Sequence, residues 1–214
     1  ALLAETKATG GPPQHTSATV PGEWTGRDAN ATESWIHMAK VQTSTVMSLL
    51  TPEYRTRQMQ ENYHQANTNV AHWPSQYCWP EGFMRRWHQA SVREHQIIVT
   101  PELVQVMAGV ARNFVTNIYV GREFTMEGAT PRLGADVPRW YGETIGFWDG
   151  DALITWTSNV QGWKSHAMFE HSNLMQSIEI YSPERDASGT LTGLTHEAIL
   201  YDPEAFVEPL RIVR

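Results

Sequence analysis

Residues 143–158 read ETIGFWDGDALITWTS and carry the clearest signal of the fold class. Two short runs of β-branched and aromatic residues, 143–148 and 151–158, lie on either side of Asp149-Gly150. An Asp-Gly pair tolerates the positive φ angles of a two-residue turn between twisted strands. The stretch therefore predicts an antiparallel β-hairpin.

Similar runs, separated by turn residues, occur on both sides of this hairpin. They predict further strands near 95–99, 102–108, 112–119, 172–181 and 191–201, with a second hairpin closing through 182–189. Because no helical pattern separates these runs, they are expected to pair with their sequence neighbours as an antiparallel meander. The prediction is a mainly β protein whose sheet is strongly curved or closed into a barrel.

The N-terminal third has a different character. Residues 1–21 contain Gly10-Gly11-Pro12-Pro13 and many Thr and Ala residues, and they predict an extended surface arm. Apolar residues at helical spacing predict a helix over 33–50, and Thr51-Pro52-Glu53 predicts the start of a second helix that runs through Gln65. The prolines and tryptophans of 67–89 indicate a long aromatic loop.

The length of 214 residues favours one domain after the arm, spanning 22–214. Within it, 22–91 is expected to form a helical and loop cover for a sheet built from 92–214. Hydrophobic residues make up 41% and charged residues 18%, as in a globular protein. Apolar runs such as 97–99 are too short to span a membrane, so no membrane span is predicted.

Charge and residue spacing argue against several partners. The net charge of −7 and the scattered basic residues disfavour nucleic acid. The nine histidines show no helical i, i+4 pair, so no bound metal is expected, and Gly142, Gly146 and Gly150 lack the helix and Lys of a phosphate loop. No cofactor is predicted. The absence of an initiator Met before Ala1 is consistent with a processed exported chain.

Four blocks carry a resemblance to a known group of proteins. Residues 140–153, WYGETIGFWDGDAL, resemble the W-x-G-x-S-I-G-x-W-x-G-D-T-L block of an uncharacterised family of exported bacterial proteins. Residues 171–181 are similar to its H-S-x-x-L-x-x-x-E-x-Y block, 78–85 to C-x-P-x-G-M-P-R, and 202–206 to D-P-x-x-Y. The resemblance covers about Gly22 to Pro209 and implies a β-rich, periplasmic or secreted protein.

The resemblance implies no activity. This chain also departs from the family pattern, because Gln176 and Met84 stand where the family often has His and Pro. In addition, Gly22-Glu23-Trp24 is similar to the G-x-W of lipocalin-type barrels, in which the Trp closes one end of the barrel.

Residues 172–181 supply the candidate site. Alternation places Leu174, Ile178 and Ile180 on one face, and the polar residues on the other. In a barrel either face can point inward; an inward polar face predicts a ligand cavity, and an outward one is an ordinary solvated surface. The polar set comprises His171, Asn173, Ser177, Glu179 and Tyr181.

Two of these residues are candidate catalytic groups, with His171 as general base and Glu179 as the acidic side chain that orients it. Eight residues of strand separate them by roughly 26 Å, so a dyad must form across strands. His171 is then expected to meet a residue of the last predicted strand. The candidates there are His196, Glu197 and Tyr201. The predicted ligand-binding residues are Trp140, Trp148, Asn173, Tyr181 and His196.

Two classes of function follow. The first is an exported barrel-like protein that binds a small apolar or aromatic molecule, with or without cofactor-independent lyase, isomerase or hydrolase activity. The second is a non-catalytic accessory subunit of a larger assembly, which contacts its protein partner through the N-terminal arm and residues 67–89.

Overall fold

The computed structural model describes residues 23–24, 43–68, 78–80, 82–83, 95–108, 114–122, 137–164 and 169–213. The predicted arm over 1–21 lies outside these residues. So do the first part of the predicted 33–50 helix and most of the aromatic loop predicted for 67–89.

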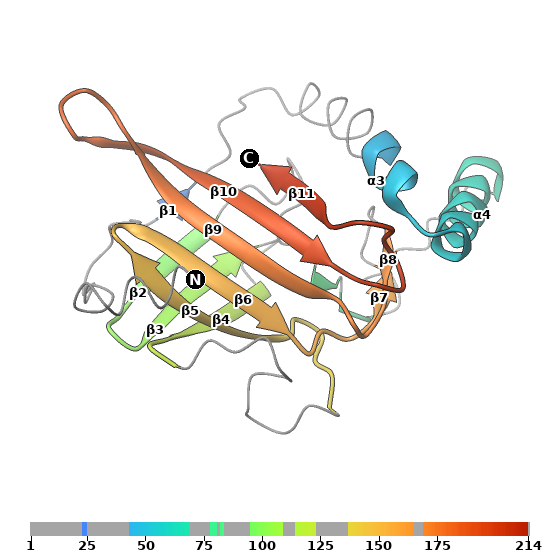
Figure 1. Ribbon diagram of the computed structural model, residues 1–214, viewed down its shortest axis with the longest axis horizontal. Helices are drawn as coiled ribbons and strands as arrows, with labels where there is room; N and C mark the ends of the chain where they lie inside the picture. Colours follow the sequence, from blue (N-terminus) through green and yellow to red (C-terminus); the bar gives the residue numbers. More distant parts are fainter. Residues whose placement is uncertain are drawn as a thin grey trace.

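The protein is mainly β, as predicted. Among the described residues, nine strands form one sheet that curls into a half-barrel (Figure 1). In sheet order these strands are β1 (Glu23–Trp24), β2 (His95–Val99), β3 (Leu103–Ala108), β4 (Phe114–Val120), β5 (Glu143–Asp149), β6 (Ala152–Ser158), β9 (Gln176–Arg185), β10 (Leu191–Tyr201) and β11 (Leu210–Val213). A separate ribbon pairs β7 (Trp163–Lys164) with β8 (Glu170–His171).

The hairpin predicted from Asp149-Gly150 joins β5 and β6. Asp149 pairs with Ala152, so the two-residue loop is Gly150-Asp151, one residue later than the Asp149-Gly150 turn that the sequence predicts. Gly150 has a φ of 61°, which is the conformation that glycine adopts without steric cost. Local sequence thus determines this connection.

One junction of the sheet differs from the predicted meander. Strands β4 and β5 are parallel, with Ile118 opposite Thr144, whereas every other neighbouring pair of described strands in this sheet is antiparallel. A parallel pair cannot be joined by a tight turn, and the chain between Val120 and Glu143 has the length that a longer connection needs. The sheet also begins earlier than expected, because β1 pairs with β2.

The strand predicted for 172–181 begins only at Gln176. Residues before it form a turn, in which the Ser172 hydroxyl accepts a hydrogen bond from Leu174 N at 3.0 Å. Strand β9 then continues to Arg185, so Ser182 and Pro183 pair with β10 instead of forming the second hairpin turn. That turn lies over 186–190, where Asp186 accepts hydrogen bonds from backbone nitrogens.

Two helices pack at one end of the sheet (Figure 1). They are α3 (Thr43–Leu49) and α4 (Pro52–Thr68), the latter starting where the capping pattern predicts and ending after the expected Gln65. Between them, Leu50 bridges to Phe206, and both belong to a buried cluster with Met175. None of the helices in the described ranges is long and apolar enough to cross a bilayer.

A second apolar cluster lines the half-barrel. It contains Ile97, Val99, Val104, Val106, Ile118, Trp148, Leu153 and Tyr181, contributed by β2 to β6 and β9. Burial of these side chains stabilises the curled sheet, because apolar burial contributes about 25 cal/mol per Å².

Candidate functional site

Strand β9 carries a buried carboxylate. Glu179 is 0% exposed, and Ser177 and Tyr181, on the same face, are also buried. Ile178 and Ile180, on the opposite face, are only partly buried. The polar face of this strand is therefore its more deeply buried face. A buried carboxylate is costly unless hydrogen-bond donors surround it.

Two ring side chains supply such donors. The Tyr181 hydroxyl donates to Glu179 Oε2 at 2.6 Å, and His196 Nε2 lies 2.9 Å from the same oxygen. Tyr181 and His196 stand directly opposite each other on β9 and β10. Their rings stack with centroids 4.5 Å apart and planes 16° from parallel. Sheet register thus builds a compact Glu-Tyr-His cluster.

The Glu179 carboxyl group and the His196 imidazole can share a proton, because His196 Nε2 lies 2.9 Å from Glu179 Oε2. The side chain of His196 is 15% exposed, whereas that of Glu179 is 1% exposed. Glu179 therefore orients the imidazole, and His196 lies nearer to solvent.

Two hydroxyls beside Glu179 have no hydrogen-bond partner. Thr155 on β6 stands directly opposite Glu179, and Ser177 precedes it on the same face. Both residues are 0% exposed, and both hydroxyl oxygens are buried without a partner. A buried polar group left unpaired costs about 1–3 kcal/mol. This part of the sheet is consequently suited to a polar group from another molecule.

An apolar wall adjoins these polar groups. Trp148 is 1% exposed and Leu153 stands opposite both Trp148 and Tyr181 in the ladder. Trp148, Leu153 and Tyr181 belong to the cluster that lines the half-barrel. The site thus combines an aromatic and aliphatic wall with a short polar row, which is the usual composition of a small-molecule site.

The structure divides the predicted site residues into two groups. Glu179, Trp148, Tyr181 and His196 lie together in the half-barrel. The other three predicted residues, His171, Trp140 and Asn173, lie around the β7–β8 ribbon and the segments next to it. Asn173 is exposed and its Oδ1 accepts a hydrogen bond from Gly162 N at 2.6 Å.

The expected pairing of His171 with a residue of the strand at 191–201 is not found. Glu179, rather than His171, meets His196 of the facing strand, and Glu197 instead pairs with Arg211 at 2.6 Å. The Nδ1 of His171 lies 3.2 Å from the Ser172 carbonyl. Burial lowers the pKa of His171 to about 4. The reason for the difference is that the chain turns at 172–175, which removes His171 from β9.

Thr155 is a site residue that sequence reasoning missed. It lies in a run where threonines 155 and 157 alternate with Ile154 and Trp156, a period-2 signal for one polar face.

Within the described ranges, no group of three or more His, Cys, Asp or Glu residues is placed to hold a metal ion. The side chains of Glu179 and His196 can form hydrogen bonds and transfer protons.

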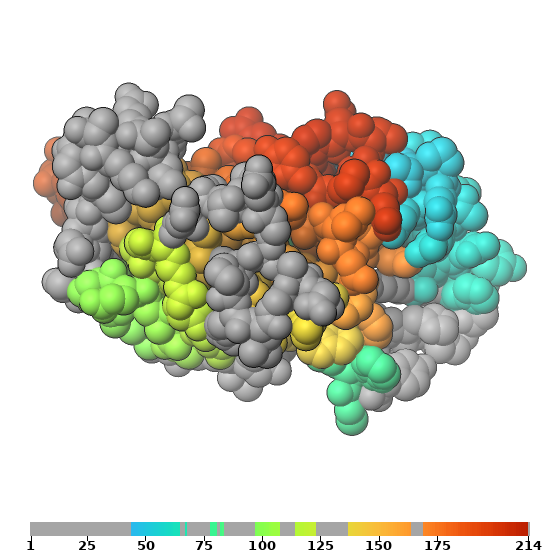
Figure 2. Space-filling view, turned by 60° about the horizontal axis from the view of Figure 1, so that its bottom comes forward, coloured from blue at the N-terminus to red at the C-terminus, as the bar shows by residue number. Residues whose placement is uncertain are grey.

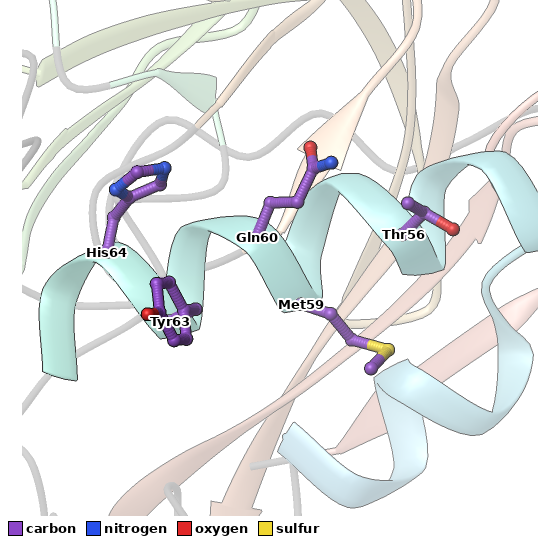
Figure 3. A pocket seen from close by; sticks show the side chains of 5 residues that line it. All are labelled: Thr56, Met59, Gln60, Tyr63 and His64. Atoms are coloured by element: carbon purple, nitrogen blue, oxygen red, sulfur yellow. The ribbon is translucent and has the colours of Figure 1, made fainter. Parts of the chain in front are cut away.

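An open pocket of about 320 Å³ lies on α4 (Figure 3). Its described lining residues all come from this one helix: Thr56, Met59, Gln60, Tyr63 and His64. Met59 and Tyr63 are 59% and 64% exposed. Residues from one helix surface do not converge on a ligand from several sides, so we assign no function to this pocket.

Comparisons of this chain with protein-family models, curated proteins and solved structures found no match.

Proposed function

We propose that this protein binds a small amphiphilic molecule on the concave side of the half-barrel. The apolar part of the ligand packs against Trp148 and Leu153, and its polar head, a hydrogen-bond donor, meets the Thr155 and Ser177 hydroxyls beside Glu179. The resemblance of residues 140–153 to exported bacterial proteins supports a periplasmic or secreted location.

One observation carries this proposal. The hydroxyls of Thr155 and Ser177 are fully buried and unpaired while they flank a buried carboxylate. Natural interiors satisfy nearly all of their buried polar groups. Two unsatisfied hydroxyls on adjacent strands therefore favour a partner that is not part of the chain.

The Glu179–His196 pair favours a second candidate function, proton-transfer catalysis without a cofactor. A carboxylate that fixes the orientation and tautomer of an imidazole is a recurring feature of general bases. His196 is the group that exchanges the proton in this scheme, and Glu179 positions it through the 2.9 Å contact. This activity requires the binding site and does not exist without it.

The binding proposal is tested with N-phenyl-1-naphthylamine, an uncharged aromatic probe with one N–H donor. We expect a saturable rise in probe fluorescence with the wild-type protein. Thr155→Val removes the hydroxyl and keeps the shape of the side chain. Loss of one hydrogen bond of about 1 kcal/mol weakens binding about fivefold. Adding Ser177→Ala weakens it further.

Thr192→Val is the matched control, because Thr192 is an exposed threonine near the tip of the β9–β10 hairpin. It should leave the binding curve unchanged. Absence of saturable binding, or an equal loss in the Thr155→Val and Thr192→Val proteins, would contradict the proposal. That result would favour the accessory-subunit alternative, which needs no enclosed ligand.

A further inference from the structure

Three tryptophans from distant parts of the sequence meet beside the β7–β8 ribbon. Trp140 and Trp163 meet at 81° with ring centroids 5.0 Å apart, so they form a right-angled corner. Trp79 occupies this corner, stacked on Trp163 at 5.3 Å and 21° and edge-on to Trp140 at 5.9 Å. Figure 2 shows the small teal-green segment containing Trp79 at the surface beside the yellow segment that precedes β5.

Two buried nitrogens next to this corner have no partner. His171 stands directly opposite Trp163 on the ribbon, so the two side chains share a face with Cβ atoms about 5 Å apart. His171 is 2% exposed and its Nε2 is unpartnered, as is the buried Nε1 of Trp163. The arrangement leaves two polar atoms unsatisfied within a largely aromatic surrounding.

The hydrogen-bonding character of both nitrogens follows from their contacts. His171 Nδ1 lies 3.2 Å from the Ser172 carbonyl oxygen, which only accepts, so Nδ1 carries the proton. In the neutral ring Nε2 is then an acceptor, whereas Trp163 Nε1–H is a donor. A hydroxyl group matches this pair, because it donates one hydrogen bond and accepts another.

Trp79 is the most weakly held of the three rings. It is 51% exposed, so it gains less from burial than a core tryptophan. Its neighbour Cys78 has a φ of 60°, which is uncommon for a residue other than glycine. A ligand that stacks better in the corner can therefore displace it.

The geometry points to a binding site for a ring that has a flat apolar face and carries a hydroxyl group. The ring stacks in the corner of Trp140 and Trp163, and its hydroxyl extends past the edge of Trp163 to Trp163 Nε1–H and His171 Nε2. Trp79 fills the corner when no ligand is bound. Phenols and pyranose sugars share this chemistry. The site is independent of the one proposed around Glu179.

The test follows the indole N–H signal of Trp163 by ¹H–¹⁵N NMR, assigned with Trp163→Phe. Phenol, methyl β-D-glucopyranoside and toluene are titrated separately. We expect phenol or the glucoside to shift the signal and so identify the source of the ring. We expect toluene, which lacks the hydroxyl, to bind about tenfold more weakly. If neither hydroxyl compound shifts the signal, or if toluene binds equally well, the proposal is overturned.

Variants show whether Trp79 competes with the ligand for the corner of Trp140 and Trp163, or whether the three rings form only a structural cluster. Trp79→Ala should strengthen binding of the hydroxyl ring about tenfold, because the competing occupant is gone. His171→Phe should weaken it, and Tyr63→Ala, which removes an exposed aromatic side chain on α4, should have no effect. Weaker or unchanged binding in Trp79→Ala overturns the proposal. Thr155→Val should leave binding of the hydroxyl ring unchanged. A failure of this proposal is therefore distinguishable from a failure of the binding site proposed around Glu179.

Discussion

Asp202 and Ser172 are joined by two buried hydrogen bonds: Ser172 N donates to Asp202 Oδ2 at 2.7 Å, and the Ser172 hydroxyl donates to Oδ1 at 2.8 Å. Asp202 Oδ1 also accepts from the backbone nitrogens of Glu204 and Ala205. The carboxylate thus joins the turn before β9 to the turn after β10. Ala205 in turn accepts a hydrogen bond from Thr51 N, at the start of α4.

The first prediction concerns this carboxylate. Asp202 is 2% exposed, so Asp202→Ala leaves several buried donors unpaired and should lower the free energy of unfolding by about 3 kcal/mol or more. Asp202→Asn keeps one acceptor and should lose about half as much. Urea unfolding measures both. Glu208→Ala, an exposed neighbour, should stay within about 0.5 kcal/mol of wild type, and an equal loss there would refute the assignment.

The second prediction concerns Tyr181. Tyr181→Phe removes only the hydroxyl that donates to Glu179 at 2.6 Å. Loss of a buried hydrogen bond of this kind costs about 1–3 kcal/mol, and the free energy of unfolding should fall by that amount. Tyr201→Phe is the matched control, since Tyr201 is 39% exposed. Equal urea midpoints for the two variants would show that the buried contact contributes nothing.

The third prediction concerns pH. His171 has a pKa of about 4 when folded, because burial disfavours its charged form, and 6.5 when unfolded. Between these values the unfolded chain binds the additional proton, so stability falls as pH drops from 6.5 towards 4. The total loss is about 3 kcal/mol, from 1.36 kcal/mol for each pKa unit.

The measurement compares urea unfolding of wild type and His171→Gln at pH 7 and pH 5. The variant should lose less stability over this interval, because it has no imidazole to protonate. An equal loss of unfolding free energy from pH 7 to pH 5 in the two proteins would show that His171 does not titrate in this way.

The fourth prediction concerns two glycines with different roles. A Cβ on Gly146 would lie 2.9 Å from both Ile118 Cγ2 and the Ile154 carbonyl oxygen, so Gly146→Ala should cost about 1–3 kcal/mol through overpacking. A Cβ on Gly150 meets nothing within 4 Å, but its φ is positive, and Gly150→Ala should cost about 1–2 kcal/mol through backbone strain. Thermal unfolding measures both costs.

A second substitution, at Ile118, distinguishes the two causes. Replacing Ile118 by Leu in the Gly146→Ala protein should recover part of the loss, because leucine is unbranched at Cβ and lacks the Cγ2 atom that the new methyl would meet. The same change should not improve Gly150→Ala. If Ile118→Leu rescues neither variant, the close approach of Gly146 to β4 is not the source of the cost.

Local patterns predicted most of the strands. The strands at 95–99 and 191–201 and the hairpin at Asp149-Gly150 depend on alternation and turn chemistry within a few residues. The parallel β4–β5 junction was not predictable in the same way, because no local signal states which strand a long connection returns to. The 172–175 turn was missed because a distant residue, Asp202, holds it.

The candidate site was only partly readable from the sequence. Alternation placed Glu179 and Tyr181 on one face, and the structure shows that this face is buried. Which residue of β10 meets Glu179 depends on register, and the pairing of Tyr181 with His196 follows from the whole β9–β10 ladder. Thr155 required the β6–β9 register as well.

The parallel contact of β4 with β5 also has a kinetic consequence. It divides the sheet into two runs of sequential strands, each rich in contacts of low sequence separation, which form early in folding. We expect the amides of Tyr119 and Ile145, at the seam between these runs, to gain hydrogen-exchange protection after those of the β5–β6 and β9–β10 hairpins. Pulse labelling during refolding would show simultaneous protection if the seam were instead the folding nucleus.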